Sequence, residues 1–112
     1  MHTVVETPEY LRAAKLAGMT DDEREGVVDH VASDPDAGEV IVGSGGARKV
    51  RVPRAGGGKR GGYRVITYYM DANTPVFLVT VISKGQQANL TEKQKQSVKR
   101  TTKTENRSRR KR

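Results

Sequence analysis

The alternation of apolar and polar residues predicts a β-meander in the second half of the chain. Three runs of strand-forming residues follow one another, over residues 48–52, 63–70 and 76–83. In the first run, a period of two places Val50 and Val52 on one face of the strand and Lys49 and Arg51 on the other. The pattern therefore predicts a sheet with an apolar face for the core and a cationic face for a polyanion.

The last of these runs is apolar on both of its faces. In a strand, every second residue lies on the same face, and one face here carries Val76, Leu78, Thr80 and Ile82. The other face then carries Phe77, Val79 and Val81. Strands buried on both sides have this composition, so the run is expected at an inner position of the sheet. The turn-forming residues 71–75 predict a hairpin connection to the strand before it.

Two helices are predicted before the meander, where they would cover its apolar face. Thr7 is a favoured N-cap residue and Pro8 suits the first helical position, while Gly18 is a natural C-terminal stop. Thr20 and Glu23 have the spacing of a capping box that begins the second helix. A short strand at residues 3–6 precedes both helices, and the fold class is therefore α+β, with two N-terminal helices packed on an antiparallel β-sheet.

Glycines cluster on both sides of the first strand of the meander. The segment 43–46 lacks the third glycine of a dinucleotide-binding fingerprint. Lys59 is followed by Arg60 rather than by Ser or Thr, so a phosphate-binding P-loop is excluded as well. We interpret the glycines as hinges that give a basic loop mobility.

Charge divides the chain into an acidic and a basic part. Residues 1–40 carry three basic and ten acidic side chains, whereas residues 41–112 carry eighteen basic and three acidic ones. Basic runs are often no more than solvated surface, but inside a strand the alternation assigns them to one face. A basic sheet set against an acidic helical half predicts nucleic-acid binding on one side of the molecule.

Length and composition limit the domain organisation and the cellular location that the chain can have. At 112 residues with 34% hydrophobic content, the chain fits one domain at 1–90, followed by a polar basic tail at 91–112. The tail would hold at most a short helix before a disordered stretch. The chain has no cysteine for a disulfide or thiolate metal site. No signal peptide and no run of about 18 apolar residues is found, so we expect a cytoplasmic protein without a membrane partner.

Candidate chemistry is limited to cations. His2 and His30 have no partner at ligand spacing, and the basic half has no carboxylate cluster, so neither a metal nor another cofactor is expected. Guanidinium groups can stabilise the negative charge of a phosphodiester transition state, and a lysine crowded by cations can exchange protons. The residues alone are equally consistent with an RNA-binding module that performs no chemistry.

Three segments in order along the chain, 43–51, 58–69 and 77–85, resemble a HigB-type toxin of the RelE/ParE toxin-antitoxin superfamily. The resemblance extends over about residues 3–95. It implies a small cytoplasmic endoribonuclease that cleaves mRNA in the ribosomal A site without a metal and so inhibits translation. It also implies a cognate helix-turn-helix antitoxin of the HigA type, with operator DNA contacted only through that antitoxin.

Carried over by motif position, the resemblance assigns three active-site cations, Arg51, Arg64 and Lys84. It assigns RNA binding to Lys49, Lys59 and Arg60. Two alternatives remain, a gyrase-directed toxin of the ParE type and a non-catalytic RNA-binding protein. The polar tail departs from the family pattern, in which an apolar helix, in some members with an aromatic residue, follows the sheet.

Overall fold

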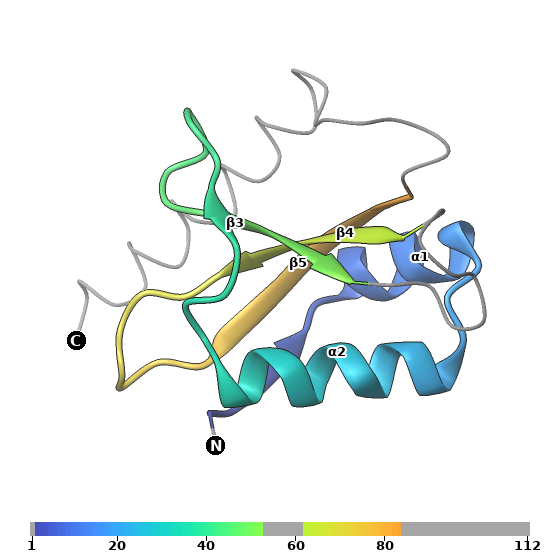
Figure 1. Cartoon of the computed structure of the whole chain (residues 1–112), viewed down its shortest axis with the longest axis horizontal. Helices are drawn as coiled ribbons and strands as arrows, with labels where there is room; N and C mark the ends of the chain where they lie inside the picture. The colour runs from blue at the N-terminus through green and yellow to red at the C-terminus, as the bar shows by residue number, and fades with distance from the viewer. Residues whose placement is uncertain (1, 53–61, 84–112) are drawn as a thin grey trace.

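A computed structural model describes residues 2–52 and 62–83, and it contains one five-stranded sheet with two helices (Figure 1). In chain order, the elements are β1 (Val4–Glu6), α1 (Pro8–Ala17), α2 (Asp21–Ser33), β2 (Glu39–Val40), β3 (Arg48–Val52), β4 (Tyr63–Tyr68) and β5 (Val76–Ser83). The strands lie in the order β1-β5-β4-β3-β2. The predicted α+β class, the two helices and the meander of β3, β4 and β5 are confirmed.

The sheet is mixed rather than wholly antiparallel, which corrects the prediction at one edge. Strand β1 runs parallel to β5, with Val4 opposite Val76, while all other neighbours are antiparallel. A parallel pair needs a long connection, and here both helices and three strands separate β1 from β5 in the chain. Strand β5 is an inner strand, as its two apolar faces predict.

Thr7 joins the start of α1 to the sheet. Its hydroxyl oxygen accepts a hydrogen bond from the backbone N–H of Tyr10 at 3.2 Å, as an N-cap does. The same hydroxyl donates to the carbonyl oxygen of Leu78 in β5 at 2.7 Å. At the other end of α1, Gly18 takes the left-handed conformation, with φ of 80°. One side chain thus fixes both the helix start and its position on β5.

The predicted capping box begins α2 and reaches into the core. The Glu23 backbone N–H donates to the Thr20 hydroxyl at 3.1 Å, and the Thr20 N–H donates to a Glu23 carboxylate oxygen at 2.8 Å. Glu23 is buried, and the Tyr63 hydroxyl donates to the same oxygen at 3.4 Å. Arg24 also pairs with Glu6 of β1 at 3.0 Å. These contacts fix α2 over β4 and β1.

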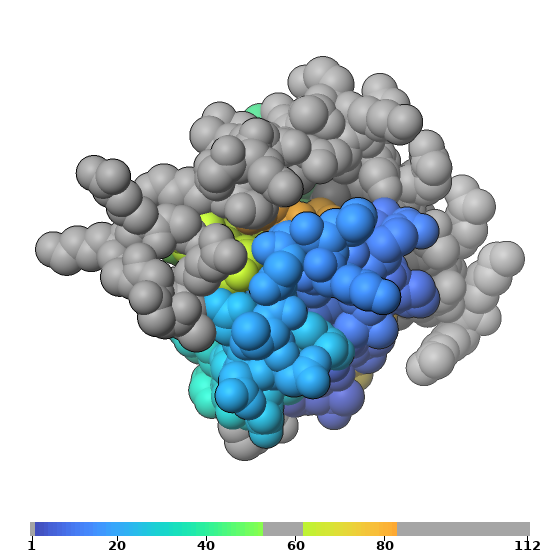
Figure 2. Space-filling view, turned by 90° about the vertical axis from the view of Figure 1, so that its right-hand side faces the viewer, coloured from blue at the N-terminus to red at the C-terminus, as the bar shows by residue number. Residues whose placement is uncertain are grey.

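The apolar side chains form one cluster on each face of the sheet. The cluster beneath the helices consists of Tyr10, Ala14, Met19, Val27, Val31, Tyr63, Val65, Val76, Leu78 and Val81. Figure 2 shows α1 and α2, coloured blue to cyan, as a continuous surface over this side. The cluster on the opposite face consists of Ala47, Ile66, Tyr68, Val79 and Ile82. The face predicted to be cationic therefore carries apolar residues as well.

The glycine segment between β2 and β3 is a hydrogen-bonded turn, not the hinge that we expected. The Ser44 hydroxyl is buried, donates to the Ile41 carbonyl at 2.6 Å and accepts from the Ala47 N–H at 3.0 Å. Gly43 has a φ of 79° and Gly46 one of 108°, values that glycine adopts without strain. The glycines therefore allow a tight turn that sets the start of β3.

Strand β4 ends two residues earlier than predicted, because the chain turns towards β5. The Asp71 carboxylate accepts from the Asn73 N–H at 2.9 Å, and the Thr74 N–H donates to the Asp71 carbonyl at 3.1 Å. This turn confirms the predicted hairpin connection.

Neither of the two helices within residues 2–52 and 62–83 is long and apolar enough to cross a membrane. The predicted domain boundary at residue 90 and the tail at 91–112 lie outside the described residues.

Tyr10 should make the stability of the protein depend on alkaline pH. Burial of the phenol, followed by the Glu6 carboxylate, raises the pKa of Tyr10 to about 12, while Arg24 acts in the opposite direction. The unfolded chain loses this proton near pH 10, so stability present below that pH should fall as the pH rises towards 12. We expect a loss on the order of 2 kcal/mol in the free energy of unfolding.

Urea unfolding of the wild type and of Tyr10→Phe between pH 8 and pH 12 measures this contribution. The variant should lose less stability than the wild type over that interval. Equal losses would show that the Tyr10 phenol does not cause the dependence.

Candidate functional site

Three cations lie together on the face of the sheet opposite the helices. In the register of β3 and β4, Arg51 lies opposite Arg64 and Lys49 lies opposite Ile66. Val50 lies opposite a valine of the core beneath the helices, so its neighbours in β3 point to the other side. We call Lys49, Arg51 and Arg64 the cationic group. The predicted separation of basic and apolar residues in β3 is confirmed.

The register places two positive charges directly opposite each other. Side chains of directly opposed residues have Cβ atoms about 4.5–5.5 Å apart, and like charges there are destabilising. Among the described residues, no ion pair involves Lys49, Arg51 or Arg64, although Glu39 lies opposite Lys49 in β2. The ion pairs of the described residues all lie on the helical side, namely Arg12–Glu9, Arg24–Glu6 and Arg24–Asp21. The cationic group therefore favours an anionic ligand.

The exposure of the cationic group suits contact with a large anion. Arg51 is exposed, whereas Lys49 and Arg64 are half-buried. A guanidinium presents several N–H donors in one plane and can bind two phosphate oxygens at once. Two such groups side by side can stabilise the additional charge of a phosphodiester transition state.

Arg48 does not belong to this group. It lies opposite Thr67 on the other face of β3, and its guanidinium donates to the Gly38 carbonyl at 3.1 Å. Gly38 has a φ of 92°, and a Cβ atom there would collide with the backbone carbonyl of Lys49. The close approach of these two backbones helps to hold the segment that carries Lys49.

A β-bulge in β5 brings two further residues to the cationic group. Ile66 pairs with Thr80, but the next residue, Thr67, pairs with Leu78, so Val79 is an extra residue in β5. The bulge places Thr80 on the same face as Ile66 and the cationic group. Ile82, which lies opposite Arg64, is on that face as well.

The sequence pattern missed this placement. Strict alternation groups Thr80 and Ile82 with Val76 and Leu78, which belong to the core beneath the helices. The bulge reverses the assignment beyond Val79. Apart from Thr80, residues 76–82 are all apolar and suit either face, so the reversal leaves no break in the pattern from which it could be predicted.

The structure describes three of the six candidate site residues. It brings Arg51, Arg64 and Lys49 together, while Lys84, Lys59 and Arg60 lie outside the described residues.

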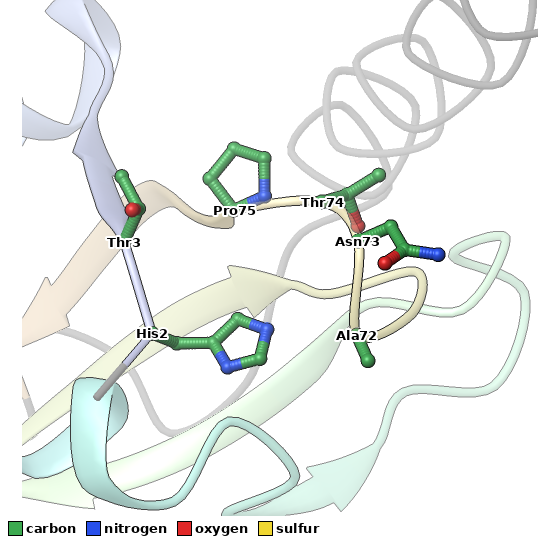
Figure 3. Close-up of a pocket in the computed structure, with 6 residues that line it drawn as sticks. All are labelled: His2, Thr3, Ala72, Asn73, Thr74 and Pro75. Carbon is green, nitrogen blue, oxygen red and sulfur yellow. The ribbon is translucent and has the colours of Figure 1, made fainter.

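A pocket lies at the opposite end of the β4–β5 pair, away from the cationic group (Figure 3). It is lined by His2, Thr3, Ala72, Asn73, Thr74 and Pro75. The His2 ring points towards the loop that carries Ala72, and it meets the ring of Tyr69 edge-on at 5.0 Å between centroids. Within the part of the chain that the structure describes, no three His, Cys, Asp or Glu residues form a group suited to a metal ion.

The opposed arginines should reduce the stability of the free protein. We expect Arg51→Gln to raise the free energy of unfolding at low salt by about 0.2–1 kcal/mol, because it removes one of two like charges. The gain should disappear near 1 M salt, where the screening length is only about 3 Å. Urea unfolding at both salt concentrations measures the effect.

Arg12→Gln is the matched control, because Arg12 is exposed and paired with Glu9. It should give no gain at low salt. A loss of stability in Arg51→Gln at both salt concentrations would show that Arg51 is stabilised by its surroundings.

Two comparisons relate the chain to known proteins. The structure resembles that of a double arginine-to-alanine mutant of the E. coli toxin RelE in the free state, with 19% sequence identity and a TM-score of 0.49. That match covers 71% of this chain and 80% of the other. A family model described as the RelE toxin of the RelE / RelB toxin-antitoxin system matches residues 3–111. Since the match extends over nearly the whole sequence, the chain belongs to the RelE family of toxins from toxin-antitoxin systems.

Proposed function

We propose that this toxin is an endoribonuclease that cleaves mRNA on the ribosome and thereby stops translation. Membership of the RelE family supports this activity. The observation that carries it in this chain is the direct opposition of Arg51 and Arg64 on the face away from the helices. Two adjacent guanidinium groups without a carboxylate partner among the described residues suit the doubly charged phosphate of a cleavage transition state.

The proposed reaction needs only the RNA and the side chains. The ribose 2′-hydroxyl loses its proton and its oxygen attacks the adjacent phosphorus, while the bond from phosphorus to the 5′-oxygen breaks. The products are a 2′,3′-cyclic phosphate and a 5′-hydroxyl, which takes up a proton. Arg64 and Arg51 stabilise the charge on the phosphorus oxygens, and Lys49 or Lys84 transfers protons. No metal takes part.

Family resemblance supplies the remaining assignments. Lys84 is proposed as a third active-site cation, and Lys59 and Arg60 act with Lys49 to hold the RNA. We further propose the HigB subtype, a cytoplasmic location and residues 1–90 as the toxin domain, with 91–112 as a basic tail.

Arg64 provides the first test of this proposal. Its loss removes a charge that acts on the transition state, while it leaves the core beneath the helices intact. We expect Arg64→Ala to lower mRNA cleavage at least 100-fold, about the effect of removing one transition-state donor. Induced expression in a bacterium, followed by mapping of mRNA 5′ ends, measures cleavage.

Arg12→Ala is the control, since it removes an equal charge from the exposed surface of α1. It should cleave as the wild type does. Growth arrest with intact mRNA in the wild type would contradict the nuclease and support a gyrase-directed toxin. Full cleavage by a well-expressed Arg64→Ala variant would remove Arg64 from the site.

The antitoxin of this toxin is proposed to be a HigA-like protein with a helix-turn-helix, through which alone the complex contacts operator DNA. Expression of the toxin gene together with its neighbouring gene should give a complex that purifies as one species and binds the operator. The toxin alone should not bind that operator specifically. Specific operator binding by the toxin alone, or a neighbouring gene product that does not bind it, would contradict this partner.

A further inference from the structure

The bulge in β5 gives the cationic group an uncharged neighbour. Thr80 lies directly opposite Ile66, and Lys49 lies opposite Ile66 on its other side. Arg64 and Thr80 are diagonal neighbours across β4 and β5, a relation that places such residues about 7–8 Å apart. Lys49, Arg64 and Thr80 thus surround Ile66, which is fully buried. Bulges are frequent beside active sites, where they redirect a side chain.

The Thr80 hydroxyl is available to a ligand. Thr80 is half-buried, and among the described residues its hydroxyl takes part in no hydrogen bond. The Thr80 hydroxyl oxygen is also not among the fully enclosed side-chain oxygens of the described residues that make no hydrogen bond, so it keeps some exposure to solvent. Thr67 of β4 offers the contrast, because its hydroxyl lies on the helix side, is fully enclosed and has no partner in the described part of the chain. The two threonines therefore differ in the face they occupy and in access.

A hydroxyl near a phosphate-binding pair is suited to the sugar of the same nucleotide strand. Both a threonine hydroxyl and a ribose 2′-hydroxyl can donate and accept hydrogen bonds. The 2′-hydroxyl is the group by which a protein distinguishes RNA from DNA at a given position. Because Thr80 is a diagonal neighbour of Arg64, a strand whose phosphate lies between Arg51 and Arg64 can place an adjacent ribose at Thr80.

We propose that Thr80 is a specificity residue that binds a ribose 2′-hydroxyl and makes the cationic group prefer RNA to DNA. The inference rests on the proposed function, because it takes the strand at the cationic group to be RNA. It adds a residue that recognises the sugar to residues that recognise the phosphate.

The test compares a single-stranded oligoribonucleotide with the oligodeoxyribonucleotide of the same sequence, both bound to the full-length protein at fixed salt. Thr80→Val keeps the shape of the side chain and removes the hydroxyl. It should weaken RNA binding about three- to tenfold, the range of one lost hydrogen bond, and leave DNA binding unchanged. Thr80→Ser keeps the hydroxyl and should retain the preference for RNA.

Thr67→Val is the matched control, since it removes a hydroxyl from the other face of the sheet. It should leave both affinities as they are in the wild type. An unchanged ratio of RNA to DNA affinity in Thr80→Val, or a wild type with no preference for RNA, would overturn the inference. Failure of the proposed function is distinguished by the cellular cleavage assay, in which the wild type would then leave mRNA intact.

Discussion

Strand β4 packs against an apolar cluster on each of its two faces, and the rest of the structure depends on this constraint. Tyr63 and Val65 pack into the core beneath the helices, whereas Ile66 and Tyr68 pack into the cluster on the opposite face. A one-residue slip of the strand would exchange the two sets and place Arg64 in the core. The hydrophobic effect on both faces therefore fixes the register, and the register fixes where Arg64 lies.

The opposition of Arg51 and Arg64 follows from that register rather than from any attraction between them. Val50 and Val52 of β3 pair with Val65 and Tyr63, and these apolar contacts are worth more than the repulsion between two partly solvated charges. The protein thus holds two like charges in place without a carboxylate partner in the described part of the chain. Such preorganisation is what electrostatic stabilisation of a transition state requires, because no free energy is then needed to assemble the charges during reaction.

Local signals in the sequence predicted the elements well. Helix α1 begins with the N-cap Thr7 and Pro8 and ends at the C-cap Gly18, and α2 begins with the capping box of Thr20 and Glu23. These ends are predictable because a cap satisfies backbone groups that are only a few residues away. The alternation in β3 also predicted the face of each cation, since one strand face is buried there.

Non-local features were not predictable in the same way. The parallel pairing of β1 depends on residues more than seventy positions away, and a three-residue strand carries no sign of its direction. The bulge at Val79 lies in a strand that is apolar on both faces apart from Thr80, so either assignment of Thr80 fits the pattern. The glycines at 43–46 permit both a mobile loop and a tight turn, and only the hydrogen bonds of Ser44 distinguish the two.

The contact between Thr7 and Leu78 also orders events during synthesis of the chain. These residues are 71 positions apart, and the N-terminal strand finds its parallel partner only in β5. A nascent chain that ends before Val76 already contains Lys49, Arg51 and Arg64, but it lacks the strand against which β1 and α1 dock. Contacts of such long sequence separation slow folding, because a large loop must close before they form. The folded sheet that carries the cationic group is therefore completed late in translation, the process that toxins of this kind are proposed to stop.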